Sequence, residues 1–170
     1  MNRSLYFLVF CIASAICGVI YPATALGPGP RALGWAEHVL ILPEMLKLKA
    51  KLDTGAQTTS IDALNITRFE QNGRPWVRFS IADREGKSAV VERPIVRTVK
   101  VKRSGLKRLN RPVIMLALCL DGIFREVAVT LSDRSNLRYP LLIGRSAMEG
   151  RFMVDSARKY TAKHHCFRSR

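Results

Sequence analysis

An alternation of apolar and basic side chains between Met45 and Leu52 constrains the fold of this chain more than any other feature. Leucine or alanine occupies positions 46, 48, 50 and 52, and lysine occupies positions 47, 49 and 51. Successive side chains of a β-strand point to opposite faces, so this pattern predicts a half-buried strand and excludes an amphipathic helix. The strand leads directly to Asp53.

Further apolar runs of strand length follow at short spacing. They occupy Trp76–Ala82, Ala89–Val101, Val113–Leu120 and Ile123–Leu131, and residue pairs typical of turns lie between them at Asn72-Gly73, Glu85-Gly86, Ser104-Gly105 and Asp121-Gly122. Such a succession of hairpins predicts a small β-barrel or β-sandwich. The segment Ser146–Phe152 is the one that favours a short helix.

The N-terminus has the layout of a secretory signal peptide over residues 1–25. Arg3 precedes an uncharged stretch from Leu5 to Ile20, and Ala23-Thr24-Ala25 forms a cleavage site. We expect cleavage after Ala25 and a periplasmic or secreted domain. The alternative is an inner-membrane anchor over residues 5–26, because this uncharged stretch is just long enough to span a bilayer.

The remaining 145 of the 170 residues suit one globular domain. Residues 26–34, with two prolines and three glycines, predict a linker, residues 35–157 the folded domain, and residues 158–170 a basic tail that frays. Cys119 and Cys166 lie outside the signal segment. A disulfide between them and two free thiols both remain open at this point.

The charge of the chain is strongly positive. Lys and Arg number 28 against 13 Asp and Glu, a net charge of +15, which indicates an anionic partner. Export argues against nucleic acid and favours an anionic envelope polymer or lipid. Much of the surplus lies in the predicted hairpin Arg97–Arg111, which has seven basic residues and no acidic one.

Two short motifs carry the chemistry. Asp53-Thr54-Gly55-Ala56 directly follows the alternating strand, although a tight turn alone would also explain these four residues. Tyr139-Pro140-Leu141-Leu142-Ile143-Gly144-Arg145 lies near the end of the domain and places apolar residues before Gly-Arg. A D-T-G loop after a strand, a hairpin-rich middle and a late apolar-Gly-Arg segment together resemble the retropepsin-like aspartic proteases.

The resemblance is strongest to a bacterial branch of these endopeptidases that also carries the name ATP-dependent zinc protease. Its blocks here are Trp35, Leu42-Pro43-Glu44, Ala50 to Ala56, Arg134, Tyr139 to Arg145 and Gly150 to Asp155, so that it covers about Gly34 to Ser156. The resemblance implies an all-β fold, a small closed barrel with one short C-terminal helix. It also implies an aspartic endopeptidase.

Aspartic proteolysis needs two carboxylates that share one proton around a water molecule. Since the chain has one D-T-G, the resemblance implies a homodimer with Asp53 supplied by each subunit. Asp155 stands too close to the C-terminus to begin a second half-site. The remaining aspartates have turn or surface contexts and are read as structural: Asp62, Asp83, Asp121 and Asp133.

The resemblance also implies a role for each motif residue. Asp53 is the catalytic acid and base, Thr54 braces the paired loops, and Gly55 lets backbone approach the carboxylate. The cleft-supporting or substrate-binding residues are Ala56, Gly144 and Arg145. Viral relatives pair this arginine with an aspartate, but the corresponding position here is Gln57. The partner of Arg145 is therefore expected to be Asp62, Asp155 or a main-chain carbonyl.

No metal or other cofactor is expected. The candidate ligands His38, His164, His165 and Cys166 lack the spacing of a zinc site, and no phosphate-binding glycine loop is present. A flap should cover the cleft, and two hairpins compete for that role, Asp83–Lys87 and Arg97–Arg111. A basic flap would favour anionic or acidic substrates.

The leading hypothesis is therefore an exported, dimeric endopeptidase that cleaves a peptide or protein of the bacterial envelope. The alternative is a catalytically inactive module with the same fold that holds anionic envelope components on its basic hairpin and tail. A third hypothesis is an assembly partner whose groove captures a strand without cutting it.

Overall fold

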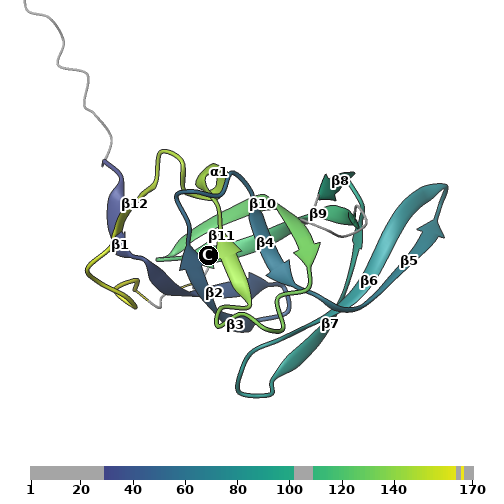
Figure 1. Cartoon of the computed structure of the whole chain (residues 1–170), viewed down its shortest axis with the longest axis horizontal. Coiled ribbons are helices and arrows are strands. Elements are labelled where there is room, and N and C mark those ends of the chain that lie inside the picture. The colour runs from purple at the N-terminus through teal and green to yellow at the C-terminus, as the bar shows by residue number, and fades with distance from the viewer. Residues whose placement is uncertain (1–28, 102–108, 164–165, 167–170) are drawn as a thin grey trace, which may run out of the picture.

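The computed structural model describes residues 29–101, 109–163 and 166, and nearly all of them belong to strands or to the turns between strands. Six strands close into a barrel in the order β10-β4-β11-β3-β2-β9, and pairing between β9 and β10 completes the ring (Figure 1). The barrel strands are β2 (Ala36–Leu42), β3 (Leu46–Leu52), β4 (Thr59–Asp62), β9 (Leu109–Leu120), β10 (Ile123–Ser132) and β11 (Leu141–Ile143). The predicted closed β-barrel is confirmed.

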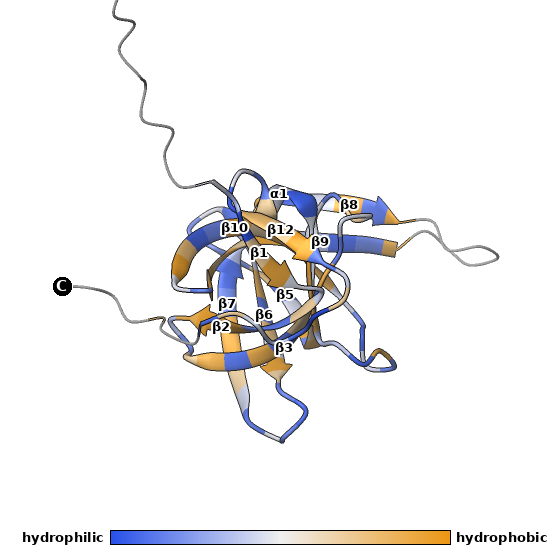
Figure 2. Cartoon of the chain, turned by 90° about the vertical axis from the view of Figure 1, so that its left-hand side faces the viewer, coloured by the Kyte–Doolittle hydropathy of each residue, from blue (hydrophilic) through white to orange (hydrophobic). Residues whose placement is uncertain are grey.

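The other elements extend this barrel. They are β1 (Arg31–Gly34), β5 (Leu64–Gln71), β6 (Arg74–Ala82), β7 (Ser88–Pro94), β8 (Arg97–Val101), α1 (Arg145–Met148) and β12 (Phe152–Asp155). Strand β8 adds to the edge of β9 (Figure 2), and β1 pairs with β12 in parallel. Among the described residues there is one short helix, α1, and it lies near the C-terminus as predicted, although it begins and ends earlier than the expected Ser146–Phe152.

The alternating segment forms β3, and its leucines and alanine are buried in the barrel core. Lys47 and Lys51 point outward, and Lys49 is partly covered. Strand β3 pairs with β2 on one side and with β11 on the other, and the β11 register places Leu52 opposite Ile143. Because both strands end together, the chain leaves the barrel at Asp53 beside the chain that leaves at Gly144.

Strands β5, β6 and β7 form a separate three-stranded sheet that projects from the barrel (Figure 1). The predicted turn at Asn72-Gly73 joins β5 to β6, with φ of 53° and 70° as such a turn requires. The expected strand Ala89–Val101 is instead two strands that break after Pro94. There the N–H of Ile95 donates to Pro75 of β6, and the N–H of Val96 donates to Val113 of β9, so the chain changes sheet.

The predicted linker 26–34 is too long at its C-terminal end. Residues 31–34 form β1, whose main chain pairs with β12, so the folded body begins before residue 35. The Arg31 guanidinium contacts the Asp121 carboxylate at 2.6 Å, and the Gly34 N–H donates to the Glu37 carboxylate at 2.8 Å. Asp121 and β12 lie far along the chain from residues 31–34, which is why the Pro- and Gly-rich composition alone suggested a linker.

The first part of the predicted tail 158–170 is also ordered. Residues 158–163 return to the barrel, where the N–H of Thr161, its hydroxyl and the N–H of Ala162 all donate to the buried Glu37 carboxylate at 2.8–3.0 Å. The N–H of Lys163 donates to Asp121 at 2.7 Å. We call residues 158–163 the C-terminal strap. Two carboxylates inside the barrel wall therefore hold a segment that was expected to fray.

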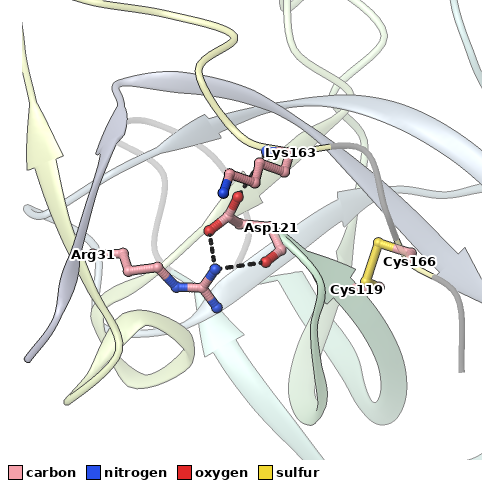
Figure 3. Close-up of a disulfide and its surroundings, with 5 residues drawn as sticks. All are labelled: Arg31, Cys119, Asp121, Lys163 and Cys166. Carbon is pink, nitrogen blue, oxygen red and sulfur yellow. Dashed lines mark hydrogen bonds and ion pairs between the residues drawn. A yellow bond between two sulfur atoms is a disulfide. The ribbon is translucent and has the colours of Figure 1, made fainter. Parts of the chain in front are cut away.

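A disulfide closes the same region, which settles the question left open for the two cysteines. Cys119 of β9 is bonded to Cys166, just beyond the strap, and the pair lies near the contacts of Asp121 with Arg31 and Lys163 (Figure 3). The predicted signal peptide or anchor, residues 1–25 or 5–26, falls outside the described residues. Among those that are described, no helix is long and apolar enough to cross a membrane.

Candidate active site

The Asp53 loop is fixed at both ends by β11 and its continuation. The Asp53 N–H donates to the Ile143 carbonyl at 2.9 Å, which extends the β3–β11 pairing by one bond. The Asp53 carbonyl accepts from the Ala56 N–H at 3.3 Å, and its Oδ1 accepts from the Gly55 N–H at 3.0 Å. The carboxylate is thus oriented by its own loop, and its side chain remains 25% exposed.

Gly144 lies where the two chain segments cross. A Cβ atom at this position would lie 2.5–2.9 Å from the main chain of Thr58, a distance that side chains do not adopt. Next to this crossing, the Arg145 N–H donates to the Ala56 carbonyl and the Ser146 N–H donates to the Gln57 carbonyl. The close crossing expected at Gly144 is present, and it fastens the loop that carries Asp53.

Arg145 also holds the loop through its side chain. The guanidinium donates to the Thr54 carbonyl at 2.7 Å and to the Gln57 side-chain oxygen at 2.9 Å. Three alternative partners were expected for Arg145, and the main-chain carbonyl is the one that it contacts. Asp62 instead accepts from the Arg134 N–H, and Asp155 pairs with Arg158, so neither contacts Arg145. A neutral glutamine occupies the place of the viral aspartate and still binds the arginine.

Thr54 and Gly55 are exposed at the tip of the loop, and Ala56 is half-buried. Thr54 and Gln57 line one side of a cleft of about 360 Å³, and α1 and β12 form the other side. Met153 of β12 lines this cleft and is 55% exposed. The loop tip therefore faces an open, partly apolar surface.

Positive charges surround the Asp53 carboxylate. Burial, the largest effect, raises the pKa of Asp53, but the Gly55 N–H and the Lys51 charge outweigh it and the pKa lies below its ordinary value. The Lys51 Nζ is 3.4 Å from Asp53 Oδ2. In the single chain, Asp53 is therefore ionised at neutral pH.

Arg134 is a second cation of this region. Its guanidinium donates to the Ser60 hydroxyl at 3.1 Å and to the Tyr139 carbonyl at 3.2 Å. Burial lowers the pKa of Arg134, while the charges of Asp62 and Asp53 raise it, so Arg134 lies within electrostatic range of Asp53. Ser60 pairs with Leu142, which pairs with Lys51, so these side chains share one face of the sheet.

Sequence reasoning assigned no role to Lys51 or Arg134. The signal for Lys51 was present, because residues two apart in a strand share a face and Lys51 precedes Asp53 by two positions. Arg134 appeared only as one block of the resemblance. Its position depends on Ser60 and Tyr139, and no local pattern around residue 134 reveals those contacts.

The two hairpins considered as a flap differ in position. The Asp83–Lys87 hairpin contacts the middle of β3 through Glu85 and Lys49 at 2.5 Å, and the residue before β3 through Lys87 and the Met45 carbonyl at 3.4 Å. Residues 102–108, the tip of the Arg97–Arg111 hairpin, lie outside the described residues. Both hairpins reach Arg134, because the charges of Arg111 and Arg84 both lower its pKa and the Arg84 guanidinium also donates to the Arg134 carbonyl at 3.3 Å.

The residues considered for zinc do not form a site in the described part of the chain. The Cys166 sulfur is bonded to Cys119, and the His38 ring stacks on Tyr160 at 4.7 Å. His164 and His165 are outside the described residues. Within the ranges described, no group of three or more His, Cys, Asp or Glu side chains could hold a metal ion.

Comparison with protein families gives a match over most of the chain. The model described as RimB-like, retropepsin-like aspartic endopeptidase RimB, matches residues 32–165. This range includes the Asp53 loop and Gly144-Arg145, and it reaches into both segments that sequence reasoning had placed outside the domain. A crystal structure of a Legionella pneumophila protein of unknown function has a TM-score of 0.69 and 35% identity, covering 78% of this chain and 98% of that one.

Similar curated proteins carry the name "Probable alpha-L-glutamate ligase". The Shewanella pealeana protein is 34% identical over 116 residues, 66% of this chain and 25% of that protein. The Desulfotalea psychrophila protein is 35% identical over 113 residues, 65% and 24% of the two chains. This chain thus spans about a quarter of the length of these relatives.

Proposed function

Because the chain belongs to the RimB-like family of retropepsin-like aspartic endopeptidases, we propose that it hydrolyses peptide bonds with a pair of Asp53 carboxylates, one from each of two copies. The observation that carries this proposal is the state of Asp53. It is oriented by the Gly55 N–H, fastened to β11 through the Ile143 carbonyl, and still open to solvent at the end of a rigid barrel strand.

The second carboxylate must come from another chain. Asp62, also near the site, is buried and accepts from the Arg134 N–H at 2.6 Å, and Asp155 is paired with Arg158 at 2.6 Å. The exposed Thr54 and the partly apolar cleft beside it support contact between two copies at this loop. A two-fold axis next to Thr54 would bring the two Asp53 side chains together.

Pairing also supplies the protonation states that the reaction requires. In one chain the Gly55 N–H and Lys51 keep the pKa of Asp53 low, against the effect of burial. A second negative charge at hydrogen-bond distance raises the pKa of one member of the pair. The ionised carboxylate then takes a proton from water, and the protonated carboxyl donates to the carbonyl oxygen of the peptide bond as the water oxygen attacks its carbon.

The substrate class that fits this site is an acidic peptide. Lys51 and Arg134 lie on the sheet face that leads to Asp53, and both are cations. The larger relatives carry the name "Probable alpha-L-glutamate ligase", which motivates glutamate as the acidic residue. We therefore propose that acidic residues flank the bond that is cleaved.

The proposed location is the bacterial envelope. The signal-like residues 1–25 motivate it, and the Cys119–Cys166 disulfide supports it because disulfides persist in oxidising compartments. The alternative of an anchor over residues 5–26 would keep the domain on the same side of the membrane.

A module that binds acidic chains without cleaving them is the second candidate. It is favoured by the relatives, in which this domain makes up about a quarter of a protein named as a ligase. The two functions differ in one respect, because binding by charge survives the loss of the Asp53 carboxylate whereas hydrolysis does not.

The test is peptide hydrolysis by purified protein from acidic to neutral pH, with peptides that have glutamate, lysine or neutral residues around the cleavable bond. We expect the glutamate peptides to be cleaved, and Asp53→Asn to lower kcat/KM by about 10³-fold. Equal cleavage by wild type and variant would assign the activity to a contaminant. Binding without cleavage by either would favour the second candidate.

A further inference from the structure

A cleft of about 270 Å³ lies between the projecting sheet and the barrel, and none of its lining residues belongs to the Asp53 loop. One wall is β5, with Ile66 and Arg68, and the other is the start of β9, with Asn110 and Arg111. The end of β10, at Leu131 and Ser132, closes it. In Figure 1, β5 and the β8–β9 pair lie on the same side of the molecule.

One wall is the outer strand of the projecting sheet, and the other is a stretch of β9 with an open edge. Strand β5 is the outer strand of its sheet and pairs only with β6 among the described residues. The last residue pair between β9 and β10 is Val113 with Thr130, and the next residue of β9 that would pair is Pro112. Proline lacks an N–H, so it ends the ladder and leaves residues 109–112 of β9 without a strand on this edge.

The edge of β9 is already used as a hydrogen-bond acceptor. The Arg68 guanidinium donates across the cleft to the Asn110 carbonyl at 2.8 Å. This bond uses one of the five N–H donors of the guanidinium. The cleft therefore holds main-chain groups of an extended strand and a cation that reaches them.

The charge and polarity of the walls define what would bind. Arg68 and Arg111 are two cations, and the one carboxylate among the lining residues, Asp133, already accepts from the Ser135 N–H and hydroxyl. Ile66 is 40% exposed and offers apolar contact. This composition suits an extended peptide with a side-chain carboxylate.

Ser132 supplies an independent indication. It is 4% exposed, and its hydroxyl has no hydrogen-bond partner in the part of the chain that the structure describes. A buried hydroxyl without a partner costs free energy, so native proteins rarely retain one without water or a ligand. Ser132 lies in the wall of this cleft, and because its hydroxyl has no exposed surface, a bound acceptor reaches it only when the wall shifts.

We propose that the cleft between β5 and β9 is a separate acidic-peptide subsite. An extended stretch of peptide runs between β5 and the open edge of β9, with one carboxylate on Arg68 and Arg111 and an acceptor that reaches the Ser132 hydroxyl. The inference rests on the proposed function only in taking this peptide to be part of the substrate. The subsite binds a substrate segment at a distance along the chain from the bond that is cleaved.

The test is binding of a fluorescein-labelled glutamate octapeptide, measured by fluorescence anisotropy in the full chain carrying Asp53→Asn, so that cleavage does not interfere. Arg68→Gln and Arg111→Gln should each raise Kd by about tenfold. Arg74→Gln is the matched control, because Arg74 is exposed on the neighbouring β6 and does not line the cleft. It should change Kd by less than about twofold.

Equal weakening by all three variants would mean general attraction to a basic protein and would overturn the subsite. Ser132→Ala should weaken binding by about threefold without lowering Tm, since the hydroxyl it removes has no partner in the free protein. If Arg68→Gln lowers Tm because it loses the contact with Asn110, the Kd of the Arg111→Gln variant alone tests the subsite. Binding of phosphatidylglycerol vesicles, and not of the peptide, through the two arginines would make the cleft a lipid site.

The outcome for the subsite is separable from the outcome for catalysis. If binding depends on Arg68 and Arg111 but the wild type hydrolyses no peptide, the proposed subsite is supported and the proposed endopeptidase activity is refuted. If the wild type hydrolyses the peptide and KM is unchanged in both arginine variants, the endopeptidase activity is supported and the subsite is refuted.

Discussion

Two carboxylates on neighbouring strands of this barrel have opposite surroundings. Glu37 of β2 is fully buried, and it accepts from the N–H groups of Gly34, Thr161 and Ala162 and from the Thr161 hydroxyl. Asp53 at the end of β3 is 25% exposed, with the Gly55 N–H on one oxygen and Lys51 near the other. A fully buried carboxylate that accepts from four donors holds structure together, whereas a partly exposed one with open acceptor sites and a neighbouring cation can react.

The largest expected effect comes from disturbing the support of Asp53 without touching its carboxyl group. Gly144→Ala places a Cβ atom about 2.5 Å from the Thr58 main chain, so the Asp53 loop must move. We expect a loss of about 3 kcal/mol in the free energy of unfolding, together with the loss of hydrolysis. Urea denaturation and the peptide assay measure the two effects.

Gly29→Ala is the matched control for that variant, since nothing lies within 4 Å of the position of its Cβ. Its stability and activity should equal those of the wild type within about 0.5 kcal/mol. An active, fully stable Gly144→Ala protein would show that the loop and the Gly144 segment do not support each other.

The next prediction compares the two carboxylates by replacing each with the corresponding amide. Glu37→Gln turns one acceptor oxygen into an amide that faces the Ala162 N–H or its neighbours, and it should cost about 2 kcal/mol of stability. Activity per folded molecule should be retained. Asp53→Asn should do the reverse, with stability changed by less than about 0.5 kcal/mol and hydrolysis lost. If both variants lose stability equally, the distinction between them is wrong.

The strap that Glu37 holds shows why part of the fold escaped prediction. Glu37 and Thr161 are 124 residues apart, and the cysteines of the disulfide are separated by 47. Composition is local, so the prolines and glycines of residues 26–34 and the basic residues after 157 suggested a linker and a frayed tail. Burial and pairing with distant residues override those local signals.

Other features were accessible because their signals are local. The alternation of β3 predicts its buried and exposed faces and places Asp53 at its end, and the turn pairs predict the hairpins. Gly144 and Arg145 came from resemblance, which carries contacts that a pattern cannot show. The separate sheet of β5, β6 and β7 was not predicted, because alternation identifies strands without saying which of them pair.

The smallest effect concerns the charge of Lys51. Burial raises the pKa of Asp53, and Lys51 and the Gly55 N–H lower it. Lys51→Met removes one lowering effect, so the pKa of Asp53 rises and its ionised form appears only at higher pH. We expect the acidic limb of the kcat/KM profile to move to higher pH. In a coupled pair this limb reports the pair and not one residue.

Lys47→Met is the matched control, because Lys47 is on the same exposed face of β3 but far from its Asp53 end. Its pH profile should coincide with that of the wild type. A profile that moves equally in both variants would reflect the net charge of the protein, and a profile that moves in neither would mean that Lys51 does not act on Asp53 in the active dimer.

The central claim is that two copies of Asp53 form one active site, and mixing wild-type protein with the Asp53→Asn variant tests it most directly. The two proteins are mixed in equal amounts under conditions that exchange subunits. The activity of the mixture is compared with that of wild-type protein alone at the same total protein concentration. If each site needs both aspartates, only wild-type pairs act and about one quarter of the activity remains. A remaining activity of about one half would show that each chain works alone and would contradict the shared dyad.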